Sequence, residues 1–224
     1  TEVNGESRYH SLETIRQYGR EKLFETDEAA PIRDRHLDYY IQLAEQGYKE
    51  LDGPNDLIWI EKLESENDNL RTALSWSLES PDVDPQKALQ LSGALQDFWD
   101  TRGYTSEGYQ WLSEALKKAP DMPTSQRCRA LAGAGLLCIR ISLDKVAVAY
   151  LDKALDLARQ LNIPPMIIPI LLGSAQAADD QVVARKRIEE AITLARTTQN
   201  QVYLSLALGM WALILSDNAP ETTR

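Results

Sequence analysis

The sequence has no apolar run long enough to cross a membrane. A transmembrane helix needs about 18 or more uncharged apolar residues, whereas the longest apolar stretch, residues 163–172, is shorter and contains three prolines. The first residues show neither the basic start nor the apolar core of a signal peptide. We therefore expect a cytoplasmic protein.

Cysteine and histidine are equally scarce, with two of each. Cys128 and Cys138 lie ten residues apart on one predicted helix. A helical rise of about 1.5 Å per residue separates them by about 15 Å, too far for a disulfide. His10 and His36 have no second histidine or cysteine at metal-ligand spacing. The sequence predicts reduced core cysteines and no metal site.

Motifs of enzymatic chemistry are also missing. No G-x-x-x-x-G-K-[ST] loop is present to bind phosphates, and no G-x-S-x-G turn presents a nucleophilic serine. No pair of titratable residues indicates acid–base chemistry on a helical scaffold. We expect a chain that is not an enzyme and that uses no cofactor.

Basic residues are outnumbered by acidic ones, 24 to 34, which gives a net charge of −10. Proteins that bind nucleic acid need a positive surface to displace counterions from phosphates. The richest basic region, residues 8–35, contains as many acidic side chains as basic ones. The composition therefore predicts that this chain does not bind nucleic acid directly.

What the sequence does contain is helical periodicity, preceded by one turn signal. Asn4-Gly5 is typical of a two-residue turn in a short N-terminal hairpin. Apolar residues then recur at helical spacing from Leu12 onward, which predicts helices from about residue 12, from Pro31 and over 55–78. Asp84 followed by Pro85 is an N-terminal cap for the next helix.

A repeat follows. Gly103, Gly108, Leu112, Ala115 and Pro120 are spaced by 5, 4, 3 and 5 residues. The central triad of this pattern, small–large–small, recurs 39 residues later and again after another 37, at Ala147, Leu151, Ala154, Ala184, Ile188 and Ala191. Repeats of this length are typical of stacked helical hairpins, and extra residues are expected in turns such as 142–144 and 162–165. The predicted fold is all-α: a right-handed superhelical stack of about ten helices in antiparallel pairs.

In such a stack the first helix of each pair lines the concave face. Residues of these helices that are not packing positions are the candidate binding residues Gln90, Asp97, Asp100, Arg129, Arg140, Gln176 and Tyr203. Arg129 and Arg140 are 11 residues apart, about three helical turns, and so share a face. Two guanidinium groups there could bind a carboxylate or phosphate of a partner. The alternative is a pair of solvated or ion-paired arginines.

Three stretches resemble a known family. Residues 8–23, RYHSLETIRQYGREKL, resemble the end of the winged-helix domain of bacterial STAND signalling ATPases. Residues 59–74, WIEKLESENDNLRTAL, are similar to a helix of the same family, and residues 98–108, FWDTRGYTSEG, resemble the hairpin that begins its repeat array. The repeats themselves resemble tetratricopeptide repeats. The resemblance implies three parts: the end of a winged-helix domain over 1–28, a helical linker over 29–80, and repeats over 81–224. The last repeat is expected to be incomplete.

The resemblance implies a function as well. Such proteins are LuxR-like or AfsR-like transcriptional regulators with an upstream nucleotide-binding core and often a DNA-binding domain, and their repeats act as a sensor arm. The expected partner of this chain is a protein, a peptide or a small-molecule effector. The apolar helix near residues 203–214 also allows a homodimer through the C-terminal end. The alternative is a free-standing scaffold or adaptor that captures short peptides or self-associates.

Overall fold

A computed structural model of the chain describes residues 2–3, 6–7, 22, 29–51 and 53–217. Over this part the protein is helical apart from one small hairpin. The first helices are α2 (Ala29–Glu50), α3 (Asp56–Ser65), α4 (Asn67–Glu79), α5 (Pro85–Ala94), α6 (Gln96–Arg102) and α7 (Thr105–Lys118). They are followed by α8 (Ser125–Arg140), α9 (Asp144–Gln160), α10 (Pro164–Gln176), α11 (Gln181–Thr197) and α12 (Gln201–Asp217).

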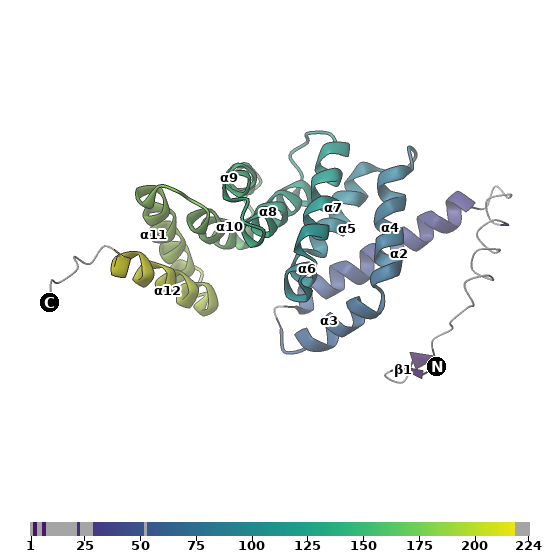
Figure 1. Ribbon diagram of the computed structural model, residues 1–224, viewed down its shortest axis with the longest axis horizontal. Coiled ribbons are helices and arrows are strands. Elements are labelled where there is room, and N and C mark those ends of the chain that lie inside the picture. The colour runs from purple at the N-terminus through teal and green to yellow at the C-terminus, as the bar shows by residue number, and fades with distance from the viewer. Residues whose placement is uncertain (1, 4–5, 8–21, 23–28, 52, 218–224) are drawn as a thin grey trace.

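The helices stack in chain order, from α2 at one end to α12 at the other (Figure 1). From α7 onward each helix packs against the next, and α8 also packs against α5 and α10. This is the predicted all-α helical-repeat solenoid. None of its described helices is long and apolar enough to cross a membrane.

The repeated small residues lie where neighbouring helices approach most closely. All members of the three triads are buried, and those other than Gly108 are at most 5% exposed. A Cβ atom built on Gly135 of α8 would lie only 2.5 Å from Leu151 Cγ of α9. The absence of a side chain at Gly135 therefore lets the two helices of this pair come together. In the next repeat a close contact occurs at Gly173 of α10, where an added Cβ would lie 2.6 Å from Leu136 Cδ2 of α8.

Four of the turns between the described helices share one geometry. Gly103, Ser142, Asn162 and Gln199 all have left-handed backbone conformations, with φ between 52° and 78°. At each of them two backbone hydrogen bonds close the preceding helix, as at Ser142, where Leu143 N donates to Cys138 O (2.9 Å). This is the Schellman arrangement. The connections here are residues 141–143 and 161–163, whereas Asp144, Pro164 and Pro165, which were expected in the turns, belong to α9 and α10.

One expected helix is two helices in the structure. The sequence predicted a single helix over 55–78, but α3 ends and α4 begins around Glu66, whose backbone (φ −105°, ψ 6°) leaves helical geometry. The Glu66 carboxylate accepts hydrogen bonds from Tyr40 of α2 (2.7 Å) and from Asn69 (2.7 Å). The tyrosine is 26 residues away in the chain, so local periodicity could not reveal the break. The cap at Asp84 is confirmed, since its carboxylate accepts from Gln86 N at 2.9 Å.

The N-terminal hairpin is confirmed as far as it is described. Strands β1 (Glu2–Val3) and β2 (Glu6–Ser7) pair antiparallel. The turn residues Asn4-Gly5 and most of the helix expected over 12–23 lie outside the described residues. The winged-helix piece over 1–28 and the boundary at residue 80 stay predictions.

Both cysteines are buried and unpaired, as expected. The Cys128 thiol faces the backbone carbonyl of Ala154 at 3.4 Å. Burial raises the pKa of each thiol to about 11. Both therefore remain protonated and weakly nucleophilic at neutral pH, as packing residues of the core.

Candidate ligand groove

The first helices of successive pairs enclose a continuous groove, here called the inner groove. It consists of two adjoining hollows of about 440 Å³ and about 660 Å³. Both are lined by α6, α8, α10 and α12 and by no residue of α7, α9 or α11. Their volumes lie in the range of about 300–1,000 Å³ that is usual for ligand sites. The expectation that alternate helices line one face therefore agrees with the structure.

The inner groove brings together most of the predicted binding residues. Asp97 and Tyr203 line both hollows, Arg129 lines the first, and Asp100, Arg140 and Gln176 line the second. Gln90, which was predicted with them, lines neither hollow. Its backbone carbonyl instead accepts a hydrogen bond from Arg129 (3.3 Å).

Arg129 connects the wall of the groove to helix α2. Its guanidinium donates to both carboxylate oxygens of Glu45, with Nη1 3.0 Å from Oε2, and lies over the ring of Tyr48, 4.8 Å from its centroid. The side chains of Arg129 and Glu45 are only 15% and 24% exposed. Burial would raise the pKa of Glu45, but the hydrogen bonds and charge of Arg129 outweigh this, and the pKa is lowered. The pair is thus a charged, largely buried clamp.

Arg140 is also paired within the chain. Its Nε and Nη2 atoms donate to the carboxylate of Asp100 at 2.9 Å and 3.0 Å, and hydrogen bonding to Asp100 raises the pKa of the arginine further. The two arginines therefore do not form the anion site that their spacing suggested. Each binds a carboxylate of the protein itself, which was the alternative interpretation. Helical spacing predicts a shared face but not what lies opposite it.

Gln96 is a groove residue that the sequence did not single out. It lines both hollows and is only 8% exposed. A glutamine beside Asp97 on a short helix carries no distinguishing pattern. Gln96 reaches the groove because α6 packs against α8, a contact that the sequence does not indicate.

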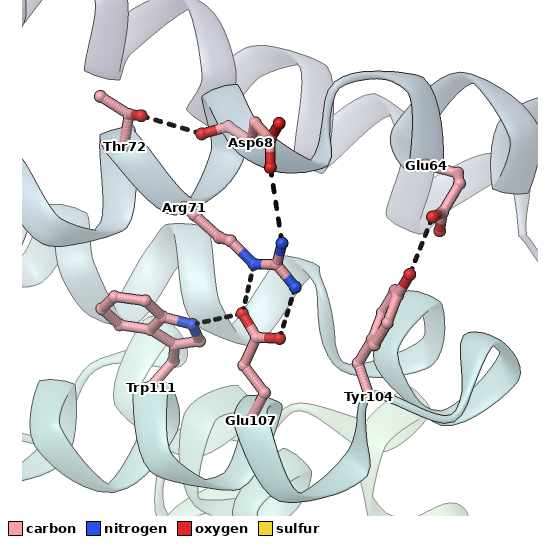
Figure 2. A network of polar contacts seen from close by, with 7 residues as sticks. All are labelled: Glu64, Asp68, Arg71, Thr72, Tyr104, Glu107 and Trp111. Carbon is pink, nitrogen blue, oxygen red and sulfur yellow. Dashed lines mark hydrogen bonds and ion pairs between the residues drawn. The ribbon is translucent and has the colours of Figure 1, made fainter.

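A second polar cluster joins helices α3 and α4 to the start of α7 (Figure 2). Arg71 of α4 donates from Nε and Nη2 to the two carboxylate oxygens of Glu107 in α7, at 2.6 Å and 2.7 Å. The indole of Trp111 donates to the same carboxylate at 3.2 Å. Hydrogen bonding from Arg71 is the main cause that lowers the pKa of Glu107. These charge-assisted bonds link α4 to α7 in one orientation.

The same cluster reaches helix α3. The Tyr104 hydroxyl, at the start of α7, donates to Glu64 Oε1 at 2.8 Å (Figure 2). Arg102 lies 3.4 Å from the other oxygen of this carboxylate. The residues of the cluster come from the stretches with family resemblance, 59–74 and 98–108, except Trp111, which lies three residues beyond the second. The resemblance thus falls on side chains that connect helices.

No group of three or more potential metal ligands occurs among the described residues. The strong ion pairs described above are carboxylate–guanidinium contacts between helices. The inner groove is the candidate ligand site considered first, and a further hollow of about 560 Å³ lies between α7 and α9.

Comparison with known proteins identifies similar regulators. The chain is 31% identical over 209 residues to a protein of Mycobacterium bovis and to one of Mycobacterium tuberculosis strain H37Rv, each named "Putative HTH-type transcriptional regulator". The match covers 89% of this chain but 23% of each relative, so the chain spans about a quarter of their length. No family model and no solved structure matches.

This similarity corrects one expectation. The net charge of −10 predicted that the segment does not bind nucleic acid directly, whereas the relatives are named for the helix-turn-helix, a DNA-binding motif. The net charge of −10 describes this chain alone. The similar helices are only about a quarter of each relative, so this charge does not exclude DNA binding by the relatives.

Proposed function

We propose that this chain is the helical-repeat sensor arm of a STAND-type transcriptional regulator and that the inner groove binds its ligand. The observation that carries the proposal is the 31% identity to HTH-type regulators over 89% of the chain. The STAND assignment is supported by the resemblance of residues 8–23, 59–74 and 98–108 to that family. The arm itself is proposed to be non-catalytic.

Two sets of contacts support coupling between the groove and the helices before the repeats. The Arg129–Glu45 clamp joins the groove wall to α2, and the Arg71–Glu107 pair joins α4 to α7. A ligand that prefers one curvature of the stack would shift the population of that curvature. The two ion pairs would then transmit the shift to α2 and α4.

The gene that contains this chain offers a direct test of the STAND assignment. We expect a G-x-x-x-x-G-K-[ST] loop encoded within roughly 300 residues before it, because STAND proteins need such a loop to hold nucleotide phosphates. A helix-turn-helix should be encoded in the same reading frame. A reading frame with neither feature would contradict the assignment and favour the free-standing adaptor.

The role of the groove can be tested by filling it. Gln176 is exposed and lines the second hollow, so Gln176→Trp should obstruct ligand binding without disturbing the core. In the full-length regulator we expect a several-fold change in the ligand-dependent transcription of a reporter, with an unchanged melting temperature.

Gln160→Trp is the matched control. Gln160 is equally exposed but lines a hollow on the other side of the stack, between α7 and α9. This variant should leave reporter transcription unchanged. Equal effects of the two tryptophans, or no effect of either, would refute the groove as the sensor site.

A further inference from the structure

The hollow between α7 and α9, here called the outer hollow, is separate from the inner groove. Its volume of about 560 Å³ is within the range usual for ligand sites. It shares no lining residue with the groove. On α8, Arg127 and Leu131 line the outer hollow, whereas Arg129 and Gly133 line the groove. Two residues turn a helix by about 200°, so the two sites lie on opposite sides of α8.

Arg127 is fixed in the outer hollow by contacts within the chain. Its side chain is only 13% exposed, and its Nε lies 2.8 Å from Asp121 Oδ1. Its Nη1 donates to the backbone carbonyls of Leu116 (3.4 Å), Ala119 (3.4 Å) and Pro120 (3.3 Å). Its Nη2 makes no hydrogen bond within the described residues and is not sealed from solvent. The arginine therefore presents two spare N–H donors in a set position.

The charged side chains around Arg127 favour an anion. Lys117 and Lys153 line the outer hollow from α7 and α9, are exposed, and make no hydrogen bond or ion pair with the described residues. The acidic lining residues are Asp156, which is exposed, and Asp121, which is paired with Arg127 and 92% exposed. Three basic groups thus face two acidic ones, although acidic residues outnumber basic ones in the whole chain. The outer hollow is locally positive on a negative protein.

The remaining lining of the outer hollow is mostly apolar. Its apolar side chains are Leu116, Met122, Pro123, Leu131, Tyr150 and Leu157. An inorganic anion would leave this surface in contact with water, whereas an anion with an apolar body would cover it. The lining therefore fits a ligand with a charged group at one end and hydrocarbon at the other.

We propose that the outer hollow binds a small organic carboxylate that carries an apolar chain. Nη2 of Arg127 donates to the carboxylate, Lys117 and Lys153 neutralise its charge, and the chain covers the apolar lining. One positive charge in excess matches a carboxylate better than a phosphate monoester, which carries about −1.5 to −2 at pH 7. The bound anion joins α7, α8 and α9 and touches none of α2 to α4, so it stabilises the repeats and leaves transcription unchanged.

The test uses the 224-residue chain with octanoate as the probe. Isothermal titration should show that octanoate binds at least tenfold more tightly than octanamide, which has the same hydrocarbon chain and no charge. At ten times its dissociation constant, octanoate should raise the melting temperature by about 3–6 °C, because it binds only the folded state.

Two double variants of equal charge locate the site. Lys117→Gln combined with Lys153→Gln should weaken octanoate binding about tenfold through the loss of two cations. The melting temperature without octanoate should not change, since neither lysine has a partner within the described residues. Lys145→Gln combined with Lys186→Gln is the matched control, because these lysines are exposed and do not line the outer hollow. This control should bind octanoate as the unaltered chain does.

Several outcomes would overturn the proposal. They are equal binding of octanoate and octanamide, equal losses of affinity in the two double variants, and no octanoate binding at all. Tighter binding of octyl phosphate than of octanoate would overturn the carboxylate assignment.

The proposal does not rest on the role of the inner groove, and the two tryptophan variants separate them. Gln160→Trp fills the outer hollow and should abolish octanoate binding while reporter transcription stays unchanged. Gln176→Trp should bind octanoate normally. Octanoate binding that survives in Gln160→Trp and is lost in Gln176→Trp would place the anion in the inner groove and overturn the proposal.

Discussion

Replacing Gly108 by alanine is expected to lower the free energy of unfolding by about 2–3 kcal/mol, although alanine is the better helix former. The added Cβ would lie 2.5 Å from Trp99 Cε3 and 2.8 Å from Leu137 Cδ1. Both neighbours are buried, with Trp99 2% and Leu137 0% exposed. A rigid indole in a close-packed core cannot move aside without disturbing its own neighbours. Urea denaturation followed by tryptophan fluorescence would measure the loss.

Gly209→Ala is the matched control for this substitution. Gly209 lies in the interior of α12, where an added Cβ would meet nothing within 4 Å. Only the helix propensity changes there, so this variant should be more stable by about 0.5–1 kcal/mol. If both glycine substitutions stabilised the protein, the close approach of α7 to Trp99 would be refuted.

Arg129→Met is expected to lower the free energy of unfolding by about 2 kcal/mol, because it leaves the Glu45 carboxylate largely buried and without its guanidinium partner. The methionine keeps most of the apolar stem, so lost packing contributes little. Chemical denaturation at pH 7 would measure the change. This loss of unfolding free energy is smaller than that expected for a fully buried ion pair, because the side chains of Arg129 and Glu45 are 15% and 24% exposed.

The pH dependence of this effect has a defined sign. Arg129 holds the pKa of Glu45 below its usual 4.5. A carboxyl with a lowered pKa in the folded state contributes stability above its unfolded pKa and loses it as the pH falls through the folded value. The difference between the unaltered protein and Arg129→Met should therefore be complete near pH 7 and shrink below about pH 4.5.

Arg140→Met serves as the control for the clamp. Arg140 makes a similar bidentate pair with Asp100, but its side chain is 55% exposed. Solvent screens such pairs, so this variant should lose less than about 1 kcal/mol. Equal losses for both arginines would contradict the view that burial makes the Arg129–Glu45 pair a clamp.

The repeat pattern predicted the fold correctly because spacing is a local property of the chain. The triads around Leu112, Leu151 and Ile188 recur at similar intervals, 39 and 37 residues, and each is buried. Ser142, in the turn between α8 and α9, likewise lies in a stretch predicted to be a turn. Positions that repeat must occupy equivalent places in a stack, so no long-range information was required.

The polar contacts could not be predicted in this way. Glu45 and Arg129 are 84 residues apart, and Arg71 and Glu107 are 36 residues apart. Charged residues are frequent on most of the described helices, α10 and α12 excepted. Which of them meet depends on the angles between helices, and these angles are set by the packing of the whole core.

The sequence by itself therefore determined the helical-repeat class, the small residues at helix contacts and the alternation that places every second helix on the inner groove. These follow from periodicity, which is a property of neighbouring residues. Only the tertiary structure decided that Arg129 and Arg140 are paired within the chain, that Glu66 ends a helix, and that Gln96 faces the groove. Those outcomes depend on distances between residues far apart in the chain, which arise only when the helices pack together.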